Sequence, residues 1–459
     1  MSNRTQVDWR ANRLPEAEIE ANFRDVLPPL ARSEALIEAD RCYFCYAAPC
    51  TNACPTGIDI PEFIQQIRSD NITGSARTIL QENIMGGMCA RVCPTEVLCE
   101  EACVRNTHET RPVRIGLLQR YATDPVISQR QQLFHRRAET GRKVVVVGGG
   151  PAGLSCAHRL ASLGHGVTIL NKSAKLGGLN EYGIAAYKTV DDFAQREVEY
   201  ILGIGGIAVE TGVTLGQDYT LADLQRDYDA VFLALGLGDV NDLGLDNEAI
   251  DGVEDAVEYI AALRQAPRKS ELPVGRRVLV IGGGMTAIDV AIQSKHLGAE
   301  EVTIVYRRGQ QQMNASAHEQ HLAQINGVAI RHWLAPRALL VEDGRARGVR
   351  FEYTALDQGG KLVMTGETCE LAADIIFKAI GQRIAWDELT GVAATLELDN
   401  GRIRVDANRK TSLATVWAGG DCVADGKDLT VSAVQDGKLA AIDIDRHLAS
   451  QPVAGASHG

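Results

Sequence analysis

Eight of the chain's 11 cysteines fall between positions 42 and 103. They form two runs, Cys42-x2-Cys45-x4-Cys50-x3-Cys54-Pro55 and Cys89-x3-Cys93-Pro94-x4-Cys99-x3-Cys103. A Cys-x2-Cys pair followed by two more cysteines, the last of them before a proline, is close to the ferredoxin-type pattern of iron–sulfur ligands. Because this spacing presents several thiolates to one metal centre, the runs predict two [4Fe–4S] clusters and a fold wrapped around them.

Disulfides and structural zinc are the other chemistries that such cysteines serve. The first twenty residues are charged and contain no apolar core of a secretory signal, which disfavours disulfides. Zinc ligands usually come as two separated Cys-x2-Cys pairs, which this segment does not show. Iron–sulfur clusters therefore fit the spacing best, and zinc is the alternative.

The composition is that of a globular protein with several domains. The 459 residues are 45% hydrophobic and 23% charged, and a chain of this length holds about two to four domains. The formal net charge of -12 argues against a nucleic-acid surface, which needs a basic patch. No uninterrupted run of about 18 apolar residues is present, so we expect no membrane span and a cytoplasmic protein.

The cysteine runs lie in a segment that predicts short helices. Ser33 is expected to be the N-cap of the first helix. Helical spacing recurs from Ile60 to Leu80, with a break near Gly74, and again from Ile115 to Ala122. We therefore assign residues 1–140 to one helical domain that holds the clusters.

A dinucleotide-binding unit comes after this domain. Lys143–Val147 is an apolar run typical of a buried parallel strand, and the turn Gly148-Gly-Gly150-Pro-Ala-Gly153 comes directly after it. A helical run from Leu154 to Leu163 and a second strand from Val167 to Leu170 complete the unit. In such a turn the first glycine makes the bend, the second admits a pyrophosphate, and the third lets helix and strand pack closely. The N-terminus of the helix favours the negative phosphates.

The same pattern recurs in the second half of the chain. Its parts are a strand at Arg277–Ile281, the turn Gly282-Gly-Gly284-Met-Thr-Ala287, a helix at Ile288–His296 and a strand at Val302–Tyr306. Ala287 in the last position of the turn is the accepted small-residue variant. Two units predict two bound dinucleotides, and a duplicate that binds nothing is the alternative.

The residues directly after the second strand of each unit bear on the choice of ligand. Asn171 stands where an acidic residue commonly binds the ribose hydroxyls. Arg307 and Arg308 come after the strand of the second unit, and paired arginines suit the 2′-phosphate of NADP. A solvated basic pair beside bound NAD is the alternative.

Together these motifs resemble the N-terminal electron-input half of dihydropyrimidine dehydrogenase, which in bacteria is a separate NAD(P)H-oxidising subunit. The chain is more distantly similar to the small subunit of glutamate synthase. The resemblance runs from about residue 30 to about residue 447. Its further motifs are Gly177-Gly178-Leu179, Gly183-Ile184, Lys188, Ala379-Ile-Gly381, Trp417-Ala-Gly-Gly420-Asp421, Thr430-Val431 and Asp436-Gly437-Lys438.

The resemblance implies an α/β protein, in which an N-terminal α-helical iron–sulfur module precedes two nested Rossmann-like dinucleotide-binding domains. A split FAD domain, 141–238 and 382–459, encloses an NAD(P) domain, 239–381. The residues expected at FAD are Gly148, Gly150, Pro151, Ala152, Gly153, Asn171, Lys172, Gly178, Leu179, Lys188, Gly420, Asp421, Thr430 and Val431. Those expected at NAD(P) are Gly282, Gly284, Met285, Thr286, Ala287, Arg307, Arg308, Ala379 and Gly381.

The resemblance also implies how the two [4Fe–4S] clusters divide the cysteines. One cluster is expected on Cys42, Cys45, Cys50 and Cys103, and the other on Cys54, Cys93, Cys99 and Gln119. Cys89 is then a spare, buried thiol. Glutamate synthase small subunits carry a glutamate in the place of Gln119, so this residue favours the pyrimidine branch. A neutral ligand in place of a thiolate should raise the potential of its cluster.

Two positions depart from the family pattern. Asn171 offers one neutral acceptor instead of a carboxylate for the FAD ribose. Asn314 stands where mammalian-type enzymes have a third arginine for the 2′-phosphate, so NADH and NADPH both stay open.

The resemblance implies an electron-input subunit that oxidises NAD(P)H at FAD and passes electrons through the clusters. The partner would be an FMN- and iron–sulfur-containing subunit that interconverts uracil or thymine and the 5,6-dihydropyrimidines. The alternatives are service to a glutamate synthase or a ferredoxin, and a non-enzymatic zinc scaffold. A disulfide reductase is disfavoured because Cys156, Cys369 and Cys422 are far apart in sequence. Direct hydride transfer needs no acid–base side chain, so no catalytic residue is named.

Overall fold

The computed structural model describes residues 14–451, and these divide into two compact units. Unit 1 contains residues 14–26, 182–190 and 239–382, and unit 2 contains residues 27–181, 191–238 and 383–451. The outermost residues of the expected domains, 1–13 and 452–459, lie outside the described part. The helical module and the FAD domain expected from the sequence thus fall into the same unit.

The beginning of the chain differs from the expected 1–140 module. Helix α1 (Glu16–Asn22) belongs to unit 1, because the buried side chains of Ile19 and Phe23 join the apolar core of that unit. The module of unit 2 begins only after residue 26.

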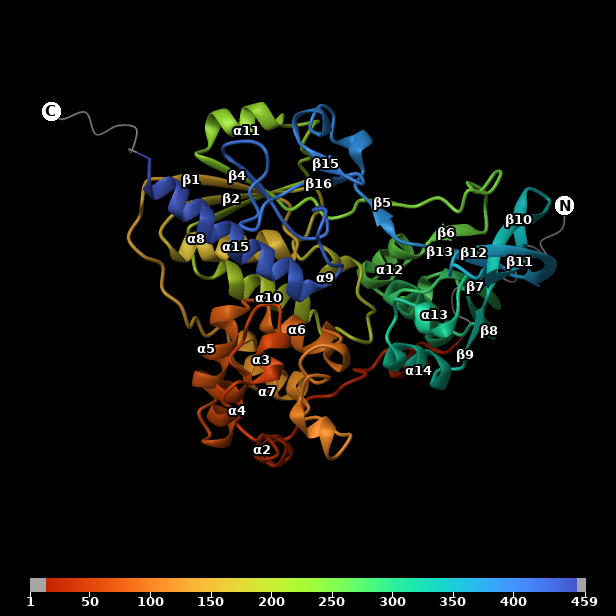
Figure 1. Ribbon diagram of the computed structural model, residues 1–459, viewed down its shortest axis with the longest axis horizontal. Helices are drawn as coiled ribbons and strands as arrows, with labels where there is room; N and C mark the ends of the chain where they lie inside the picture. The colour runs from red at the N-terminus through yellow and green to blue at the C-terminus, as the bar shows by residue number, and fades with distance from the viewer. Residues whose placement is uncertain (1–13, 452–459) are drawn as a thin grey trace. The chain divides into compact units, whose positions relative to one another are not determined.

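The cysteine-bearing part of unit 2 consists of short helices (Figure 1). They are α2 (Arg32–Asp40), α3 (Pro49–Ala53), α4 (Ile60–Arg68), α5 (Ile72–Glu82), α6 (Gly86–Val92), η1 (Thr95–Val97), η2 (Val104–Thr107) and α7 (Ile115–Ser128). The expected break near Gly74 lies instead between α4 and α5, because Asn71 caps α5 by accepting the N–H of Gly74 at 3.0 Å. Ser33 is not an N-cap: α2 starts earlier, where the Ala31 N–H donates to Glu34 at 2.8 Å.

A parallel sheet forms the second half of unit 2, in the order β17-β4-β1-β2-β3. Its strands are β1 (Lys143–Val147), β2 (Gly166–Asn171), β3 (Ile207–Thr211), β4 (Ala230–Leu233) and β17 (Val416–Ala418). The Val-rich β1 lies between β2 and β4, where both of its faces are covered, which explains its unbroken apolar run.

Helices cover both faces of this sheet. They are α8 (Pro151–Ser162), α9 (Leu179–Tyr182), α10 (Phe193–Leu202), α11 (Leu221–Asp227) and α15 (Thr430–Ala449). Figure 1 shows α8 and α15 side by side below the strands and α11 above them. Met85 and Met88 of the module share one apolar core with Phe193 and the strands. Helix α6 of the module is therefore packed against α10 and α15, two of the helices that cover the sheet with the first glycine turn.

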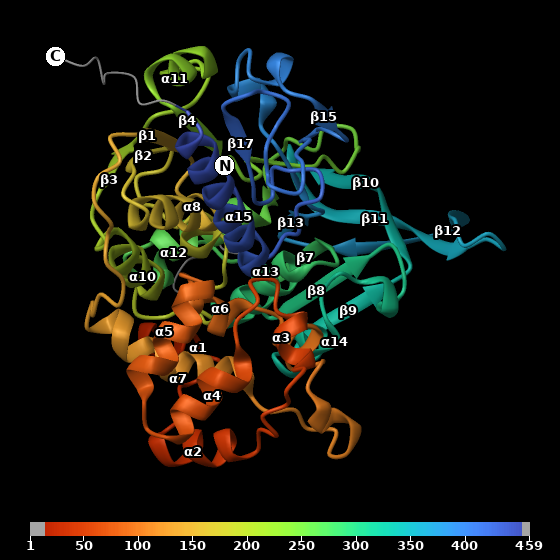
Figure 2. The same ribbon diagram turned by 60° about the vertical axis from the view of Figure 1, so that its left-hand side comes forward.

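Unit 1 contains a second parallel sheet, in the order β6-β13-β7-β8-β9, and an antiparallel sheet, β10-β11-β12 (Figure 2). Its strands are β6 (Val253–Asp255), β7 (Arg277–Gly282), β8 (Glu301–Tyr306), β9 (Val328–His332), β10 (Leu334–Glu342), β11 (Arg345–Leu356), β12 (Leu362–Ala372) and β13 (Ile375–Ala379). Its longer helices are α12 (Ala256–Gln265), α13 (Met285–His296) and α14 (Ala317–Ile325). None of the helices between residues 14 and 451 combines the length and hydrophobicity of a membrane span.

Candidate functional site

The first glycine turn connects β1 to α8, and two of its glycines are required by the protein itself. Gly148 has a φ of 103°, and a Cβ there would lie 2.2 Å from the carbonyl oxygen of Ala234. A Cβ on Gly153 would lie 1.9 Å from the carbonyl oxygen of Gly148. These two positions therefore set the bend and the close packing of the helix on the strand.

The middle glycine of the turn, Gly150, has no such internal reason. Its φ of -78° suits any residue, and the nearest atom to a Cβ there is the Cα of Gly178 at 3.7 Å. Gly150 is also the N-cap of α8 and gives the helix no side-chain cap. A glycine that leaves open space before uncapped N–H groups is what a pyrophosphate requires, so this turn fits the phosphates of a dinucleotide.

Three further segments of unit 2 gather at the start of α8. The Gly177 N–H donates to the Gly149 carbonyl at 2.7 Å, which brings the Gly178–Leu179 loop to the turn. Thr430 Oγ1 donates to Asn180 Oδ1 at 2.7 Å, and Val431 beside it is buried. A Cβ on Gly420 would lie 3.1 Å from the Cβ of Ala152. The structure thus brings these expected FAD residues to one place.

Asp421 comes directly after this Gly420 turn and is largely shielded from solvent. Burial, with the charge of Asp428, raises the pKa of Asp421 to about 7. A second carboxylate, Asp436, fixes the turn by accepting the Gly420 N–H at 2.9 Å, and it pairs with Arg409 Nε at 2.9 Å. Asp421 is therefore held beside the turn in a form that donates or accepts a hydrogen bond near neutral pH, which suits a polyol hydroxyl.

The Asn171 side chain serves the protein's own loop. Its Oδ1 accepts the Gly149 N–H at 2.9 Å, and its amide group donates to the carbonyls of Ser173 at 2.6 Å and Lys175 at 3.1 Å. The side chain is buried, whereas its neighbour Lys172 is exposed and pairs with Glu388. An aspartate at 171 lacks the two donors that hold this loop, which explains an amide there.

Lys188 belongs to unit 1, not to unit 2 with the other expected FAD residues. Its Nζ lies 2.8 Å from Asp289 Oδ1 and 2.9 Å from Glu319 Oε1. Burial lowers the pKa of Lys188, but the two carboxylates outweigh burial and raise it above the ordinary value. The ammonium group is thus charged and held by two acids of unit 1, and its contact with FAD stays a prediction.

The second glycine turn, between β7 and α13, repeats the first. Gly282 has a φ of 152°, and a Cβ there would lie 2.1 Å from the carbonyl oxygen of Ala379. Gly284 has a φ of -97°, and no atom lies within 4 Å of a Cβ built on it. Ala287 replaces the third glycine and is fully buried in the helix. Met285 and Thr286 form the uncapped first turn of α13, so this turn also fits a dinucleotide.

The two arginines after β8 present their side chains to solvent. Both are exposed, while their carbonyls accept from Thr354 Oγ1 at 2.8 Å (Arg307) and the Trp333 N–H at 3.2 Å (Arg308). Within residues 14–451 neither guanidinium has an ion-pair partner. Asn314 is exposed as well. Gly381, just after β13, has a φ of 93° and accepts the Asn241 N–H at 3.1 Å.

One cavity of the helical module is lined by the four cysteines expected at the first cluster. Its empty volume is about 360 Å³, and Cys42, Cys45, Cys50 and Cys103 lie in its wall together with apolar side chains. Burial raises the pKa of Cys50 to about 12. In such a site the thiolate form needs the positive charge of a metal, so this donor set fits iron.

The remaining cysteines form a second group. Electrostatic interactions link Cys93 with Cys54, Cys99 and Cys89, and the hydrogen bond with Cys89 and burial raise the pKa of Cys93 well above its ordinary value. Cys89 is buried, as expected of a spare thiol. Among residues 14–451 no three His, Cys, Asp or Glu side chains converge as they would around a single ion such as structural zinc.

Gln119, the fourth ligand expected at the second cluster, is buried on α7. Its Nε2 donates to the Gly86 carbonyl at 2.6 Å, which leaves Oε1 as the free end of the amide. The Gly86 end of α6 is itself held by Glu197 of α10, whose Oε1 accepts the N–H groups of Gly87 at 2.8 Å and Met88 at 3.1 Å. Burial raises the pKa of Glu197 to about 8.

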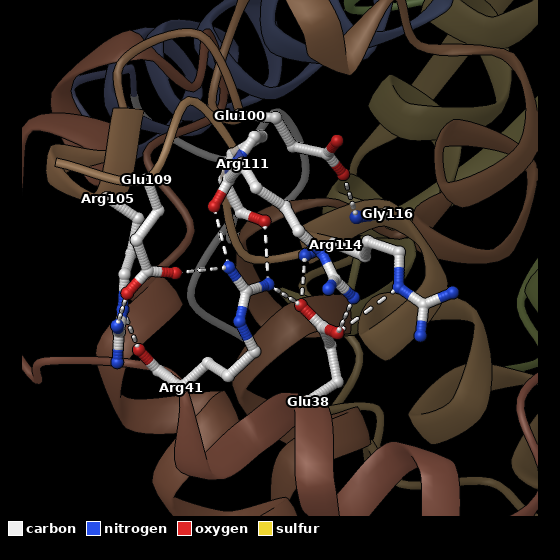
Figure 3. A network of polar contacts seen from close by, with 9 residues as sticks. Glu38, Arg41, Glu100, Arg105, Glu109, Arg111, Arg114 and Gly116 are labelled. Carbon is white, nitrogen blue, oxygen red and sulfur yellow. Dashed lines mark hydrogen bonds and ion pairs between the residues drawn. The ribbon is translucent and has the colours of Figure 1, made fainter. Parts of the chain in front are cut away.

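A network of ion pairs and hydrogen bonds joins the two ends of the cysteine segment (Figure 3). Arg41, next to Cys42, donates to Arg111 O at 2.6 Å and pairs with Glu109 at 3.1 Å. Arg105, two residues after Cys103, donates to Arg41 O at 2.6 Å. The first and last cysteines of the segment are therefore fixed close to each other.

Glu38 is the buried centre of this network (Figure 3). It accepts the Arg114 N–H at 3.0 Å and pairs with Arg114 Nε at 3.2 Å and with Arg41. Burial acts to raise the pKa of Glu38, but these donors outweigh it, so the pKa is lowered and the carboxylate stays charged. Sequence reasoning missed Glu38 and Glu197, since no motif marks either residue.

Family models match most of the chain. Residues 19–131 match the model described as dihydropyrimidine dehydrogenase domain II, 4Fe-4S cluster. Residues 142–437 match the model described as pyridine nucleotide-disulphide oxidoreductase.

Two curated relatives cover almost the whole chain. The NAD-dependent dihydropyrimidine dehydrogenase subunit PreT of Escherichia coli K12 is 35% identical over 428 residues, 93% of this chain and 98% of the relative. The glutamate synthase [NADPH] small chain of the same organism is 33% identical over 446 residues, 91% of this chain and 92% of the relative.

Solved structures share the fold at low identity. Mycobacterium tuberculosis FprA in complex with NADPH has a TM-score of 0.58 and 19% identity, covering 68% of this chain and 85% of its own. Thioredoxin reductase of T. acidophilum has a TM-score of 0.53 and 22% identity, covering 67% of this chain and 100% of its own.

Proposed function

Because this chain belongs to the pyridine nucleotide-disulphide oxidoreductases, and among them to the family of dihydropyrimidine dehydrogenase PreT subunits, we propose that it is the electron-input subunit of a dihydropyrimidine dehydrogenase. It would oxidise NADH or NADPH at FAD and deliver the electrons through two [4Fe–4S] clusters to a partner FMN subunit. That partner would interconvert uracil or thymine and the 5,6-dihydropyrimidines.

The observation that carries the proposal is that the first glycine turn and the cysteine groups lie in one compact unit, in which helices of the module share an apolar core with the sheet. Electron transfer over protein distances needs donor and acceptor at a fixed separation, and this packing supplies it. FAD, when bound, supplies the hydride acceptor and the single-electron donor. The chain's own residues hold the pyrophosphate before α8, offer Asp421 to the flavin's polyol, and fix the thiolates through the Glu38 network.

The second glycine turn would hold the nicotinamide dinucleotide. Its open Gly284 admits the pyrophosphate, and Arg307 and Arg308 are free to meet a 2′-phosphate. The relatives include an NAD-dependent subunit and an NADPH-named small chain, so either nucleotide agrees with the family.

The names of the relatives support a partner subunit. One is called a subunit of a pyrimidine enzyme and the other the small chain of glutamate synthase, which supports the transfer of electrons to a second polypeptide. Gln119, where glutamate synthase small subunits have glutamate, favours the pyrimidine partner. Electron delivery to a glutamate synthase large subunit or a ferredoxin is the second candidate, favoured by 33% identity to the small chain.

The test combines the purified holoprotein with a pyrimidine-reducing FMN subunit under anaerobic conditions. We expect oxidation of NADH or NADPH that depends on both uracil and the partner, with dihydrouracil as product. A glutamate synthase large subunit with glutamine and 2-oxoglutarate, and a ferredoxin, serve as parallel acceptors. Turnover with one of these and none with uracil would contradict the pyrimidine assignment.

A further inference from the structure

Unit 2 contains a second cavity that neither the glycine turn nor the cysteines line. Its volume is about 280 Å³, close to the lower end of the range of about 300–1,000 Å³ typical of small-molecule sites. Its walls come from the end of α5, the segment between α7 and β1, the second half of α8, and Lys438 of α15. Ser155, the lining residue of α8 nearest to Gly150, lies five residues beyond it, about 7.5 Å along the helix, and no residue of the glycine turn lines the cavity.

The charged side chains in the wall are mostly cationic. Arg77, Arg137, Arg159 and Lys438 line the cavity against one carboxylate, Glu82. That carboxylate is already engaged, because Lys438 Nζ lies 2.9 Å from Glu82 Oε2 and also donates to the Thr56 carbonyl at 2.8 Å. The three arginines therefore face the cavity without a counter-charge of their own.

The contacts of these arginines agree with the lack of a counter-charge, because their hydrogen bonds go to backbone carbonyls. Arg159 Nη2 donates to the Gln81 carbonyl at 2.6 Å, and Arg77 donates to the Leu133 carbonyl. Within residues 14–451 none of the three has an ion-pair partner. Burial lowers the pKa of Arg159, with only a partial opposing effect from Glu82. Arg159 is half-buried, and a partly desolvated cation gains from an anion that enters the cavity.

One wall of the cavity is apolar and contains an unsatisfied ring. Leu80, Ile84 and Phe134 line it, and the rings of Phe134 and His158 stand nearly perpendicular with their centroids 5.7 Å apart. His158 is 6% exposed, and its Nε2 has no hydrogen-bond partner within the described residues. Burial lowers the pKa of His158 to about 3, so the ring is neutral and adds no charge to the cationic side.

The geometry points to a binding site for a small organic phosphate, with its phosphate group against Arg77, Arg137 and Arg159 and a flat apolar part against Phe134 and Leu80. Guanidinium groups match phosphate oxygens in paired hydrogen bonds. A phosphate monoester carries about -1.5 to -2 charges near neutral pH, which compensates several arginines better than one carboxylate does. The site lies where the helical module and the first glycine-turn sheet meet, and it is distinct from both expected cofactor sites of unit 2.

Phenyl phosphate is the minimal probe, because it joins one phosphate monoester to one flat ring. Calorimetric titration of the holoprotein, with FAD and iron contents recorded, should show saturable binding at one site. Benzoate keeps the ring but lacks the phosphate group, and inorganic phosphate lacks the ring. Each should bind at least about tenfold more weakly than phenyl phosphate.

Arg159→Met and Arg137→Met should each weaken phenyl phosphate binding by about tenfold or more. Arg137 is exposed, so its substitution leaves the fold intact even if Arg159→Met disturbs it. Arg404→Met is the matched control, since this arginine is 71% exposed, lies in the same unit and does not line the cavity.

Unchanged binding in both cavity variants would overturn the proposal, as would the absence of saturable binding by the wild-type protein. Equal affinity for benzoate would refute the phosphate assignment, and equal affinity for inorganic phosphate would refute the apolar part.

Discussion

The two glycine turns share one backbone design but differ in the residues at the ends of their second strands. In both, the first glycine lies against a carbonyl, at 2.2 Å from Ala234 and 2.1 Å from Ala379 to a built Cβ, and the middle glycine faces open space. Asn171, the last residue of β2, turns its side chain inward and bonds the turn and its own loop. Tyr306 holds the same place at the end of β8, where its ring lies against Gly283 and its hydroxyl donates to the Gln312 carbonyl at 2.6 Å. After β8 the side chains of Arg307 and Arg308 point to solvent.

A buried polar side chain thus bonds the first turn, whereas an aromatic ring lies against the second turn and two exposed arginines come after its second strand. A turn that is bonded by a buried side chain suits a dinucleotide that stays bound through many turnovers, as FAD does. A turn with exposed cationic side chains nearby suits a dinucleotide that binds and leaves in every cycle, as NAD(P)H does. Under the proposed function, the same local fold would serve a resident cofactor in unit 2 and an exchanging one in unit 1.

The largest effect is expected when the middle glycines are exchanged for alanine. Both positions tolerate a Cβ within the protein, so Gly150→Ala and Gly284→Ala should fold normally. Gly150→Ala should be purified without FAD, whereas Gly284→Ala should keep FAD and show a KM for NAD(P)H raised by at least about tenfold. Flavin absorbance and steady-state kinetics with an artificial acceptor measure the two results.

Gly359→Ala, in an exposed turn of unit 1, is the control for a harmless added methyl group. The distinction between the turns fails if Gly150→Ala retains FAD, or if Gly284→Ala leaves the KM unchanged.

An acid at position 171 restores the residue type of the family but removes the donors that hold the loop. Asn171→Asp should therefore lower the free energy of unfolding of unit 2 by about 1–3 kcal/mol, without tightening FAD binding. Chemical unfolding followed by flavin fluorescence measures both quantities. Asn408→Asp, on an exposed loop of the same unit, should have almost no effect. Tighter FAD binding by Asn171→Asp would contradict the view that the side chain at position 171 serves the loop and not FAD.

The role of the two exposed arginines after β8 is tested by removing both side chains. The double variant Arg307→Ala, Arg308→Ala should lose about tenfold in kcat/KM with NADPH and much less with NADH, because only NADPH carries the 2′-phosphate. Arg350→Ala, an exposed arginine of the same unit paired with Glu370 at 2.8 Å, is the control. Equal losses for both nucleotides would mean that the pair does not read the 2′-phosphate.

The smallest expected effect is a change in how the stability of unit 2 depends on pH. The pKa of Glu197 is raised to about 8 in the folded protein, above its unfolded value of 4.5. A raised pKa gives stability that is complete below about pH 4.5 and is lost as pH rises through about 8. Glu197→Gln keeps the oxygen that accepts from Gly87 and Met88 but does not titrate, so it should make the stability depend less on pH. Unfolding midpoints of the flavin-bound protein between about pH 5 and pH 8 measure the change, and an unaltered slope would contradict the assignment.

Local sequence was enough to predict the main elements and the family. The apolar strands and glycine spacings predicted both dinucleotide units, and the comparisons confirm the α/β fold class, the resemblance, and the FAD, nicotinamide and 4Fe–4S cofactors. The features that sequence did not reveal depend on contacts between distant residues. Glu38 meets Arg114 across 76 positions, and Glu197 meets Gly87 across 110. The place of α1 in unit 1 was also not predictable, because two buried side chains decide it.

The individual site residues and the domain limits stay predictions. The structure brings Gly150, Gly178, Gly420 and Thr430 together, and it places four cysteines in one cavity wall. It places Lys188 in the other unit, in an ion pair that no local pattern indicates. A motif identifies the residue type needed for a ligand, whereas packing decides which atoms remain available to it.

The most direct test of the central claim is an anaerobic titration of the holoprotein with NADH and then NADPH, recorded by absorbance and by electron paramagnetic resonance. One or both nucleotides should bleach the flavin and generate reduced iron–sulfur signals in the same chain, with about eight iron atoms per chain. Zinc in place of iron, or a bleached flavin beside clusters that stay oxidised, would contradict an electron path from nicotinamide through FAD to the cysteine module.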